Sequence, residues 1–187
     1  MPPKVKITKN DITRTAVSLI RNNGIEAFNT RNIAKELNCS TQPIFSNFTS
    51  MEELENEVIL FAYNMYLDFI KNEISTDKYP KYKAFGMAYI RFAKEETQLF
   101  KLLFMRDRTD EDTSPSPDFN DSVQIIMSTN GVSEEIAKLI HLEMWTFVHG
   151  IAVMLATSFT PFDWELINQM ISDVYQGIRH KHILKDC

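Results

Sequence analysis

Apolar residues recur three and four positions apart along almost the whole chain, and this spacing places them on one face of an α-helix. Strand signals, such as an Asn-Gly turn between two alternating runs, do not occur. The pattern therefore predicts an all-α fold. Capping residues and stop signals set the expected helices, which are 9–23, 30–37, 41–47, 51–74, 80–94, 96–105, 119–130, 133–158 and 163–180.

The first two helices have clear boundary signals. Thr8 and Asp11 form a capping pair at the start of the first helix, and Gly24 provides a stop. Asn29 can cap the second helix. Asn38 can end it, because Asn, after Gly, best tolerates the left-handed conformation that often follows a helix.

The third helix is short, and the fourth is long. Ser40 or Thr41 can cap the third, with Pro43 in its first turn, where a missing N–H costs nothing. Ser50 and Glu53 form a predicted capping box for the fourth helix. We expect this long helix to connect two domains.

Charge is unevenly distributed over the 187 residues, whose formal net charge is −5. Residues 1–50 contain seven Lys/Arg and three Asp/Glu, a balance of +4, whereas residues 51–187 contain thirteen and twenty-two, a balance of −9. This asymmetry indicates that the N-terminal part binds a polyanion. Residues 106–118 contain two prolines and no large apolar residue, which predicts a loop.

Composition and targeting signals favour a folded cytoplasmic protein. The chain is 44% apolar and 24% charged, and its first residues lack the apolar core of a signal peptide. Its two cysteines cannot build a disulfide framework, and Cys39 is interpreted as a small buried residue. The longest uncharged apolar run, 144–162, is interrupted by His149, Gly150 and Pro161 and falls short of a bilayer span, so we expect a buried helix and no membrane contact.

The first three helices have the lengths and the short turn of a helix-turn-helix unit, which reads the major groove of DNA. The recognition helix would be 41–47. Ile44 and Phe48 are four positions apart and should face the other two helices. This leaves the polar and small residues on or near the outer side, namely Gln42, Pro43, Ser46 and Asn47.

Residues 24–54, GIEAFNTRNIAKELNCSTQPIFSNFTSMEEL, resemble the signature of the tetracycline-repressor (TetR) family. The resemblance implies a transcriptional regulator, usually a repressor, that binds a palindromic operator as a homodimer. It also implies a helix-turn-helix domain over residues 1–50 and a helical ligand-binding and dimerisation domain over residues 51–187.

The resemblance places individual DNA contacts. Arg31, Gln42 and Pro43 match positions that reach bases, and their side chains suit guanine, adenine and the thymine methyl group respectively. Thr30, Ser46 and Asn47 match positions that touch phosphates. The predicted DNA-binding set is Thr30, Arg31, Thr41, Gln42, Pro43, Phe45, Ser46 and Asn47.

Two positions depart from the family pattern. The family usually has Tyr where Phe45 stands and Lys where Met51 stands. Each of these two changes removes a contact with the phosphate backbone of DNA. We therefore expect a shallower salt dependence of DNA binding than is usual for the family. Lys4, Lys6 and Lys9 could add phosphate contacts from the N-terminal arm.

The C-terminal part resembles one class of TetR regulators through the sequence MWTFVHGI at 144–151 and the aromatic stretch 92–104. The abundant aromatic and Met residues can simply fill a core, but they also suit an unidentified apolar or weakly polar small ligand. The resemblance implies a pocket holding Tyr66, Tyr89, Phe92, Phe104, Trp145 and His149.

His149 alone leaves four interpretations open: a metal ligand, a catalytic base, a pocket donor or a packed core histidine, of which the last is favoured. Ligand spacing for a metal is lacking, and His141 and Glu143 lie on different helix faces. No Ser-His-Asp order, Gly-rich phosphate loop or His-Glu-x-x-His pattern occurs, so we expect neither enzyme activity, nor a cofactor, nor a metal.

The helices 133–158 and 163–180 are the predicted dimer interface, because the former is apolar nearly all round and one chain cannot cover it. Ligand binding would tilt the helix 51–74 and change the spacing of the two recognition helices. The alternative is a protein that keeps this fold as a sensor or protein-interaction module with weak or no operator binding.

Overall fold

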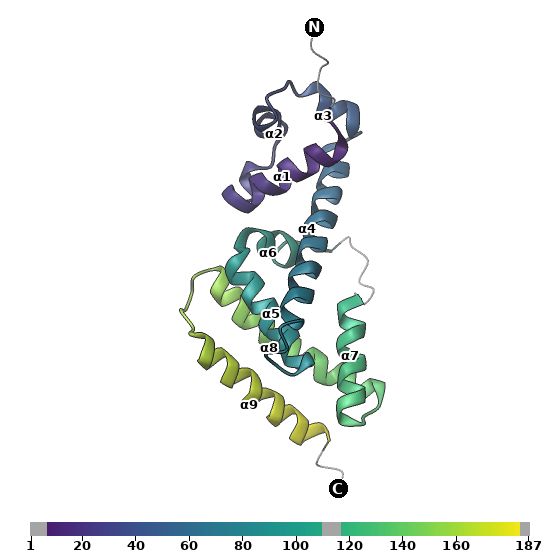
Figure 1. Cartoon of the computed structure of the whole chain (residues 1–187), viewed down its shortest axis with the longest axis vertical. Coiled ribbons are helices and arrows are strands. Elements are labelled where there is room, and N and C mark those ends of the chain that lie inside the picture. The colour runs from purple at the N-terminus through teal and green to yellow at the C-terminus, as the bar shows by residue number, and fades with distance from the viewer. Residues whose placement is uncertain (1–6, 110–116, 184–187) are drawn as a thin grey trace. The chain divides into compact units, whose positions relative to one another are not determined.

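The computed structural model describes residues 7–109 and 117–183 (Figure 1). These residues form nine α-helices and one short 3₁₀ helix, with no strand among them, so the predicted all-α class is confirmed. Two compact units are present. The first contains the described part of residues 1–68 together with 96–106, and the second contains 69–95 together with the described part of 107–187.

The helices of the first unit begin and end within one or two residues of the predicted positions. They are α1 (Lys9–Asn23), η1 (Ile25–Ala27), α2 (Thr30–Glu36), α3 (Gln42–Asn47), the first part of α4 (Met51–Ile74) and α6 (Thr97–Phe104). The capping box of Thr8 and Asp11 is present. Gly24 (φ +83°) and Asn38 (φ +50°) follow α1 and α2 in backbone conformations with positive φ, as their residue types indicated.

The expected caps of the third and fourth helices are only partly correct. Thr41 precedes α3, but its side chain makes no capping hydrogen bond. Ser50 Oγ accepts from the backbone N–H of Glu53 at 3.0 Å, as a capping box requires. The Glu53 carboxylate, however, accepts from the backbone N–H of Thr49 at 2.6 Å, and it also binds Lys9 of α1.

The second unit is built around α8 (Glu134–Ala156), which packs against α5 (Lys81–Glu95), α7 (Pro117–Asn130) and α9 (Trp164–His182) (Figure 1). α7 begins two residues earlier than predicted. The predicted loop 106–118 lies partly outside the described residues. Asp163 caps α9, since its carboxylate accepts from Leu166 N–H at 2.8 Å, as expected.

α8 is long and apolar enough to cross a membrane, judged by length and composition alone. Central helices of a bundle pass the same test, because neighbours cover them on several sides. Ile140, Met144 and Ile151 of α8 are buried within the second unit. The expectation of a buried helix is only partly correct, since Trp145 is 46% exposed. The helix ends at Ala156, within two residues of the predicted end.

Candidate DNA interface and effector region

The α2–turn–α3 segment is anchored to the first unit by apolar side chains. Ile33 and Ala34 of α2 are buried, and so are Ile44 of α3 and Phe48 directly after it. Ile44 and Phe48 therefore face inward, as their spacing predicted. The turn closes with a hydrogen bond from Cys39 N–H to the carbonyl of Ala34 at 2.9 Å.

The structure places the predicted DNA-binding residues on or near the outer surface of this segment. Arg31 of α2 is exposed, and Thr30 beside it is half-buried. On α3, Gln42, Phe45 and Ser46 are exposed. The remaining three are half-buried, namely Thr41, Pro43 and Asn47. Their contacts with DNA stay predictions.

Two of these side chains already donate hydrogen bonds to protein carbonyls. Ser46 Oγ donates to the carbonyl of Gln42 at 2.9 Å. Asn47 Nδ2 donates to the carbonyls of Pro43 at 2.8 Å and Ile7 at 3.4 Å. The Asn47 amide nitrogen has two hydrogens, and both are directed at protein carbonyls. A phosphate contact from that nitrogen would replace one of these bonds.

An open groove of about 970 Å³ runs between α1, the turn and α3. It is lined by Ile7, Asp11, Arg14, Thr15, Leu37, Asn38, Cys39, Ser40, Gln42, Pro43 and Ser46. Cys39 is half-buried along this groove, so it is more accessible than the small buried residue that the sequence predicted. Sequence reasoning missed the groove, because it forms only when residues thirty positions apart meet in space.

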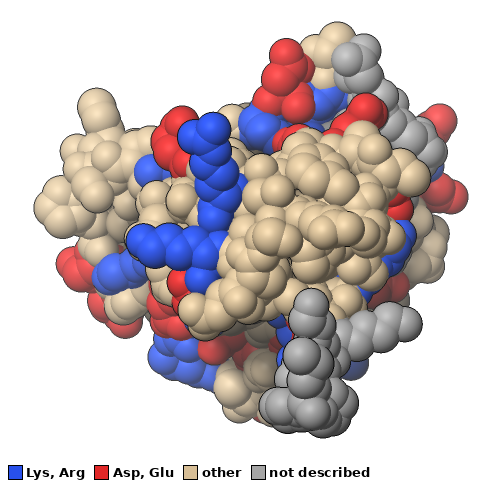
Figure 2. Space-filling view, turned by 90° about the horizontal axis from the view of Figure 1, so that it is seen from above, with Lys and Arg blue, Asp and Glu red and all other residues tan. Residues whose placement is uncertain are grey.

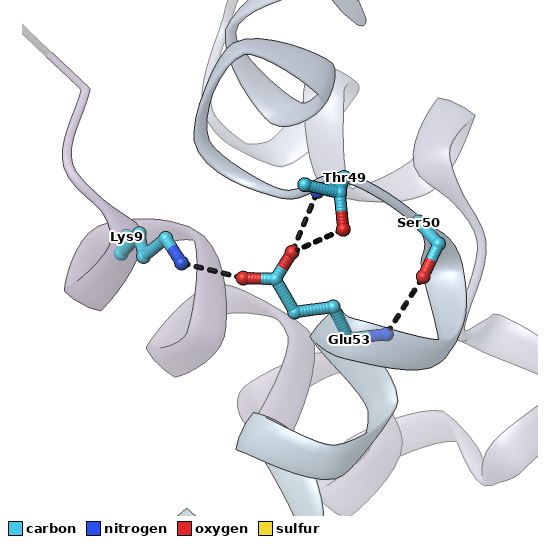
Figure 3. A network of polar contacts seen from close by, with 4 residues as sticks. All are labelled: Lys9, Thr49, Ser50 and Glu53. Atoms are coloured by element: carbon cyan, nitrogen blue, oxygen red, sulfur yellow. Dashed lines mark hydrogen bonds and ion pairs between the residues drawn. The ribbon is translucent and has the colours of Figure 1, made fainter.

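Lys9, Thr49, Ser50 and Glu53 form a polar network between α1 and the start of α4 (Figure 3). Lys9 Nζ lies 2.6 Å from Glu53 Oε1 and 4.9 Å from the centre of the Phe48 ring. The hydrogen bond from Lys9, followed by those from Thr49, lowers the pKa of Glu53 to about 2. Lys9 thus binds a carboxylate of its own chain, whereas Lys4 and Lys6 lie outside the described residues.

Charged side chains do not form one continuous field at the end of the molecule seen in Figure 2. Long Lys and Arg side chains project beside a broad uncharged area, and several Asp and Glu side chains lie toward the outline of the view. Such cations suit individual phosphate contacts.

The six residues of the predicted ligand pocket are divided between the two units and make three separate sets of ring contacts. In the first unit, Tyr66 and Phe104 meet edge to face with ring centres 5.1 Å apart. In the second unit, Phe92 packs edge to face on Phe69 at 5.5 Å. The other three form a Tyr–His–Trp cluster. A single pocket formed by all six stays a prediction.

The Tyr–His–Trp cluster consists of Tyr89, His149 and Trp145. The hydroxyl of Tyr89 lies 2.9 Å from His149 Nδ1, and the Trp145 ring stacks on His149 at 5.1 Å with an angle of 13° between the planes. Burial of His149 lowers its pKa from 6.5, because the charged form loses hydration. The geometry agrees with a packed, hydrogen-bonded histidine.

A second Tyr–His pair in the same unit escaped sequence reasoning. The hydroxyl of Tyr82 lies 3.1 Å from His141 Nδ1, which repeats the contact of Tyr89 with His149. The two tyrosines are seven positions apart on α5 and the two histidines eight apart on α8, so each helix advances about two turns between the contacts. This matched spacing was the signal available in the sequence.

Within residues 7–109 and 117–183, no group of three His, Cys, Asp or Glu side chains is placed to hold a metal ion. His141 pairs with Tyr82, whereas Glu143 pairs with Lys181 and His182 of α9. The two residues therefore point to different neighbours, as their helix positions indicated.

A helix-turn-helix unit followed by a mainly helical C-terminal unit defines the class of this molecule. A family profile described as bacterial regulatory proteins of the tetR family matches residues 12–58, and one described as the tetracyclin repressor-like C-terminal domain matches residues 82–173. The chain belongs to the TetR family of DNA-binding transcriptional regulators. The narrower C-terminal class suggested by the sequence MWTFVHGI stays a prediction.

Two solved structures show the same fold. A protein with unknown function from Rhodococcus sp. RHA1 is 14% identical, with a TM-score of 0.70 over 97% of this chain and 98% of that one. The ketosteroid transcriptional regulator KstR2 of Mycobacterium tuberculosis is 12% identical, with a TM-score of 0.55 over 93% of this chain and 96% of that one. No curated protein sequence matches the chain.

Proposed function

We propose that this protein is a cytoplasmic repressor that binds a palindromic operator as a homodimer and leaves it when a small-molecule effector binds. The outward face of α3 is the observation that carries this proposal. Gln42, Phe45 and Ser46 are exposed on a short helix whose position is fixed by buried Ile44 and Phe48. A recognition helix requires this combination of a rigid base and small or polar exposed residues.

Base contacts come from α2 and α3. The Arg31 guanidinium can donate two hydrogen bonds to guanine, Gln42 can pair with adenine, and Pro43 can touch a thymine methyl group. Phosphate contacts come from Thr30, Ser46 and Asn47, together with Thr41 at the start of α3. These contacts set the register on the duplex but carry no sequence information by themselves.

Dimerisation uses α8 and α9, which carry exposed apolar side chains. On α8, Leu139, Leu142 and Trp145 are 43%, 55% and 46% exposed, and Leu166 on α9 is 43% exposed. A second copy of the chain would cover these exposed apolar side chains in a dimer interface. A two-fold symmetric dimer would bring two recognition helices to successive major grooves, about 34–36 Å apart.

The effector is an apolar or weakly polar small molecule bound among the aromatic helices. Tyr89 and His149 supply polar groups within a mainly apolar neighbourhood, which is the usual composition of a ligand pocket. The effector lowers operator affinity by the ratio of its affinities for the free and the operator-bound protein. Tilting of α4 would carry this change to α3.

Selection of random duplex DNA by the purified protein tests the proposal. We expect one palindromic sequence to be recovered at moderate salt and to bind more weakly at raised salt. Gln42→Ala should weaken binding to that sequence and relax the preference at one base pair in each half-site. Gln124→Ala, on the exposed surface of α7, is the matched control and should bind as the parent protein does.

The salt dependence tests the two departures from the family pattern. Phe45 has no hydroxyl for a phosphate, and Met51 has no charge. Met51→Lys should make the slope of log K against log salt steeper by about one, the value for one added phosphate contact. A parent slope steeper than about −8 would contradict the loss of backbone contacts.

The second candidate function is a sensor or protein-interaction module that keeps the fold but binds DNA weakly. Phe45 favours it, because this aromatic side chain is 57% exposed at the centre of the recognition helix. If neither the parent protein nor Met51→Lys recovers any duplex above background, the result would favour the sensor or interaction module.

A further inference from the structure

Phe45 presents an apolar ring on the outward face of α3. Its side chain is 57% exposed, and no other large apolar side chain of the described helices α1, α2 and α3 is exposed. Ile44 and Phe48 occupy the inward positions of this segment and are buried, so a rotation that buried Phe45 would expose them. The fold therefore holds the Phe45 ring in solvent, and the ring does not belong to the core of the first unit.

The polar side chains next to Phe45 donate to carbonyls of the protein. Ser46 Oγ donates to the carbonyl of Gln42 at 2.9 Å. Asn47 Nδ2 donates to the carbonyl of Pro43 at 2.8 Å. These bonds direct the two donors toward the backbone rather than outward. The surface of α3 around Phe45 is therefore mainly apolar, with the exposed Gln42 amide about one turn earlier.

The major groove of DNA contains one apolar group that matches such a ring, the C5-methyl group of thymine. The pattern that distinguishes the other bases there consists of hydrogen-bond donors and acceptors. A phenyl ring has no polar atom, so packing it on a donor or acceptor would leave that polar group without a partner and would cost free energy. Of the groups on the base edges, the thymine methyl therefore suits Phe45 best.

Helix geometry predicts where this methyl group lies. Phe45 is three residues after Gln42, so the two side chains share the outward face of α3 and are about 4.5 Å apart along its axis. Neighbouring base pairs are about 3.4 Å apart. A helix that lies along the groove therefore brings Phe45 to the base pair beside the one that Gln42 contacts.

We propose that Phe45 is a specificity-determining residue that packs on the C5-methyl group of a thymine in the operator, beside the base pair that Gln42 contacts. This inference rests on the proposed function and deepens it. Phe45 has no hydroxyl for a phosphate, and the inference gives its ring a role in reading bases. A base contact specifies sequence, whereas a phosphate contact only sets position.

Replacement of single thymines by uracil in the selected operator tests the inference, because uracil pairs as thymine does but lacks the methyl group. The affinity of the full-length protein for each such duplex is measured by fluorescence anisotropy. At one thymine, beside the base pair whose preference Gln42→Ala relaxes, uracil in one half-site should weaken binding about fourfold, the value for one buried methyl group. Uracil in both half-sites should weaken binding about fifteenfold.

Variants assign the methyl group to Phe45. Phe45→Ala should bind the thymine and uracil duplexes equally at this position, with an unchanged melting temperature, because the ring is exposed. Phe45→Tyr keeps the ring and should keep the uracil effect. Ile25→Ala is the matched control, because Ile25 is an exposed apolar residue of the same unit outside α3. This control should discriminate between the two duplexes as the parent protein does.

Two outcomes would overturn the inference. In one, the selected operator has no thymine beside the base pair of Gln42, or uracil there leaves binding unchanged. In the other, uracil weakens binding of the parent protein and of Phe45→Ala equally, which would assign the methyl group to another residue such as Pro43. If no duplex is selected at all, the proposed function fails and the inference fails with it. That result is distinct from the other two and would assign the exposed ring to a protein partner.

Discussion

The DNA-reading helices of the first unit and the central helix of the second unit differ in how strongly local signals define them, although ion pairs such as Arg21–Glu96 join distant residues in the first unit as well. In the first unit, α2 and α3 have seven and six residues, and α1 and α2 are bounded by local signals, such as the Thr8 capping box and the positive φ angles of Gly24 and Asn38. In the second unit, α8 has 23 residues and is defined by partners far away in the sequence. Its Tyr–His contacts join residues 59 and 60 positions apart.

This difference agrees with the tasks that we propose for the two units. A DNA-reading unit must present a few side chains in one fixed arrangement, and short, capped helices on a small core provide this rigidity. A ligand-responsive unit needs an apolar interior that can repack around a guest, and long helices rich in aromatic residues provide it. The loss of stability caused by removing a core side chain should therefore stay local in the first unit and spread among the helices of the second.

Matched core truncations should give the largest effect and test this comparison directly. Ile44→Ala and Ile140→Ala each remove side chains that are at most 1% exposed, and each should cost about 2–5 kcal/mol of local stability. Hydrogen exchange should show faster opening of α1–α3 for Ile44→Ala and of α5, α7 and α8 for Ile140→Ala. Equal loss of protection in both units for either variant would show that they unfold as one.

Removal of a base contact should have the next largest effect and should leave both units folded. Arg31→Ala should weaken binding to the selected operator by about 1–3 kcal/mol, because the fork to guanine is lost. The melting temperature should stay unchanged, since the Arg31 side chain is exposed. Equal weakening on all duplexes would instead assign Arg31 to a phosphate.

Removal of a helix cap should have a smaller effect that differs between the units. Asn29 caps the seven-residue α2 by accepting from Asn32 N–H at 2.9 Å, and Ser133 caps α8 by accepting from Ile136 N–H at 3.4 Å. Asn29→Ala should cost about 1 kcal/mol and be seen in the urea midpoint of the first unit. Ser133→Ala should cost less, because packing dominates the stability of the longer helix. The reverse order would contradict the contrast between local and long-range specification.

The smallest expected effect is a change in pH dependence within the second unit. Burial places the pKa of His149 below 6.5, so the unfolded chain binds more protons than the folded one in this range. Stability should therefore be fully present above about pH 6.5 and should fall as the pH drops through the folded pKa. His149→Gln should remove this part of the pH dependence, measured as urea midpoints between about pH 5 and 7.5.

Tyr89→Phe provides the control for that measurement. It removes the hydrogen bond to His149 but leaves the histidine buried, and burial is the cause of the lowered pKa. The pH dependence should therefore persist in Tyr89→Phe. Its loss would assign the pKa shift to the hydrogen bond rather than to desolvation.

The sequence correctly indicated most of the helix boundaries and the two faces of α3. Capping side chains, glycines and prolines act on residues one to four positions away, so a single sequence contains the whole interaction. The same reasoning failed at Glu53, because its carboxylate turns to Thr49 and Lys9. Lys9 is 44 positions away, and nothing local to Glu53 signals it.

The candidate site was predictable to different extents. Arg31 and Gln42 lie on the expected outer surface, because helix periodicity fixes their direction once Ile33 and Ile44 are buried. The expected pocket residues were identified by resemblance, and the structure divides them between the two units. Their assignment needs the mutual arrangement of helices, which residue spacing within one helix does not contain.

The sequence by itself determined the all-α class, the positions of the short N-terminal helices and the outward face of the recognition helix, since each depends on interactions within a few residues. Only the tertiary structure showed the attachment of α6 to α1 through Arg21 and Glu96, the network of Lys9 with Glu53, and the paired Tyr–His contacts of α5 with α8. These contacts join residues 44 to 75 positions apart. Such pairs form only after the intervening chain has folded, because the apolar packing of whole helices decides which polar side chains meet.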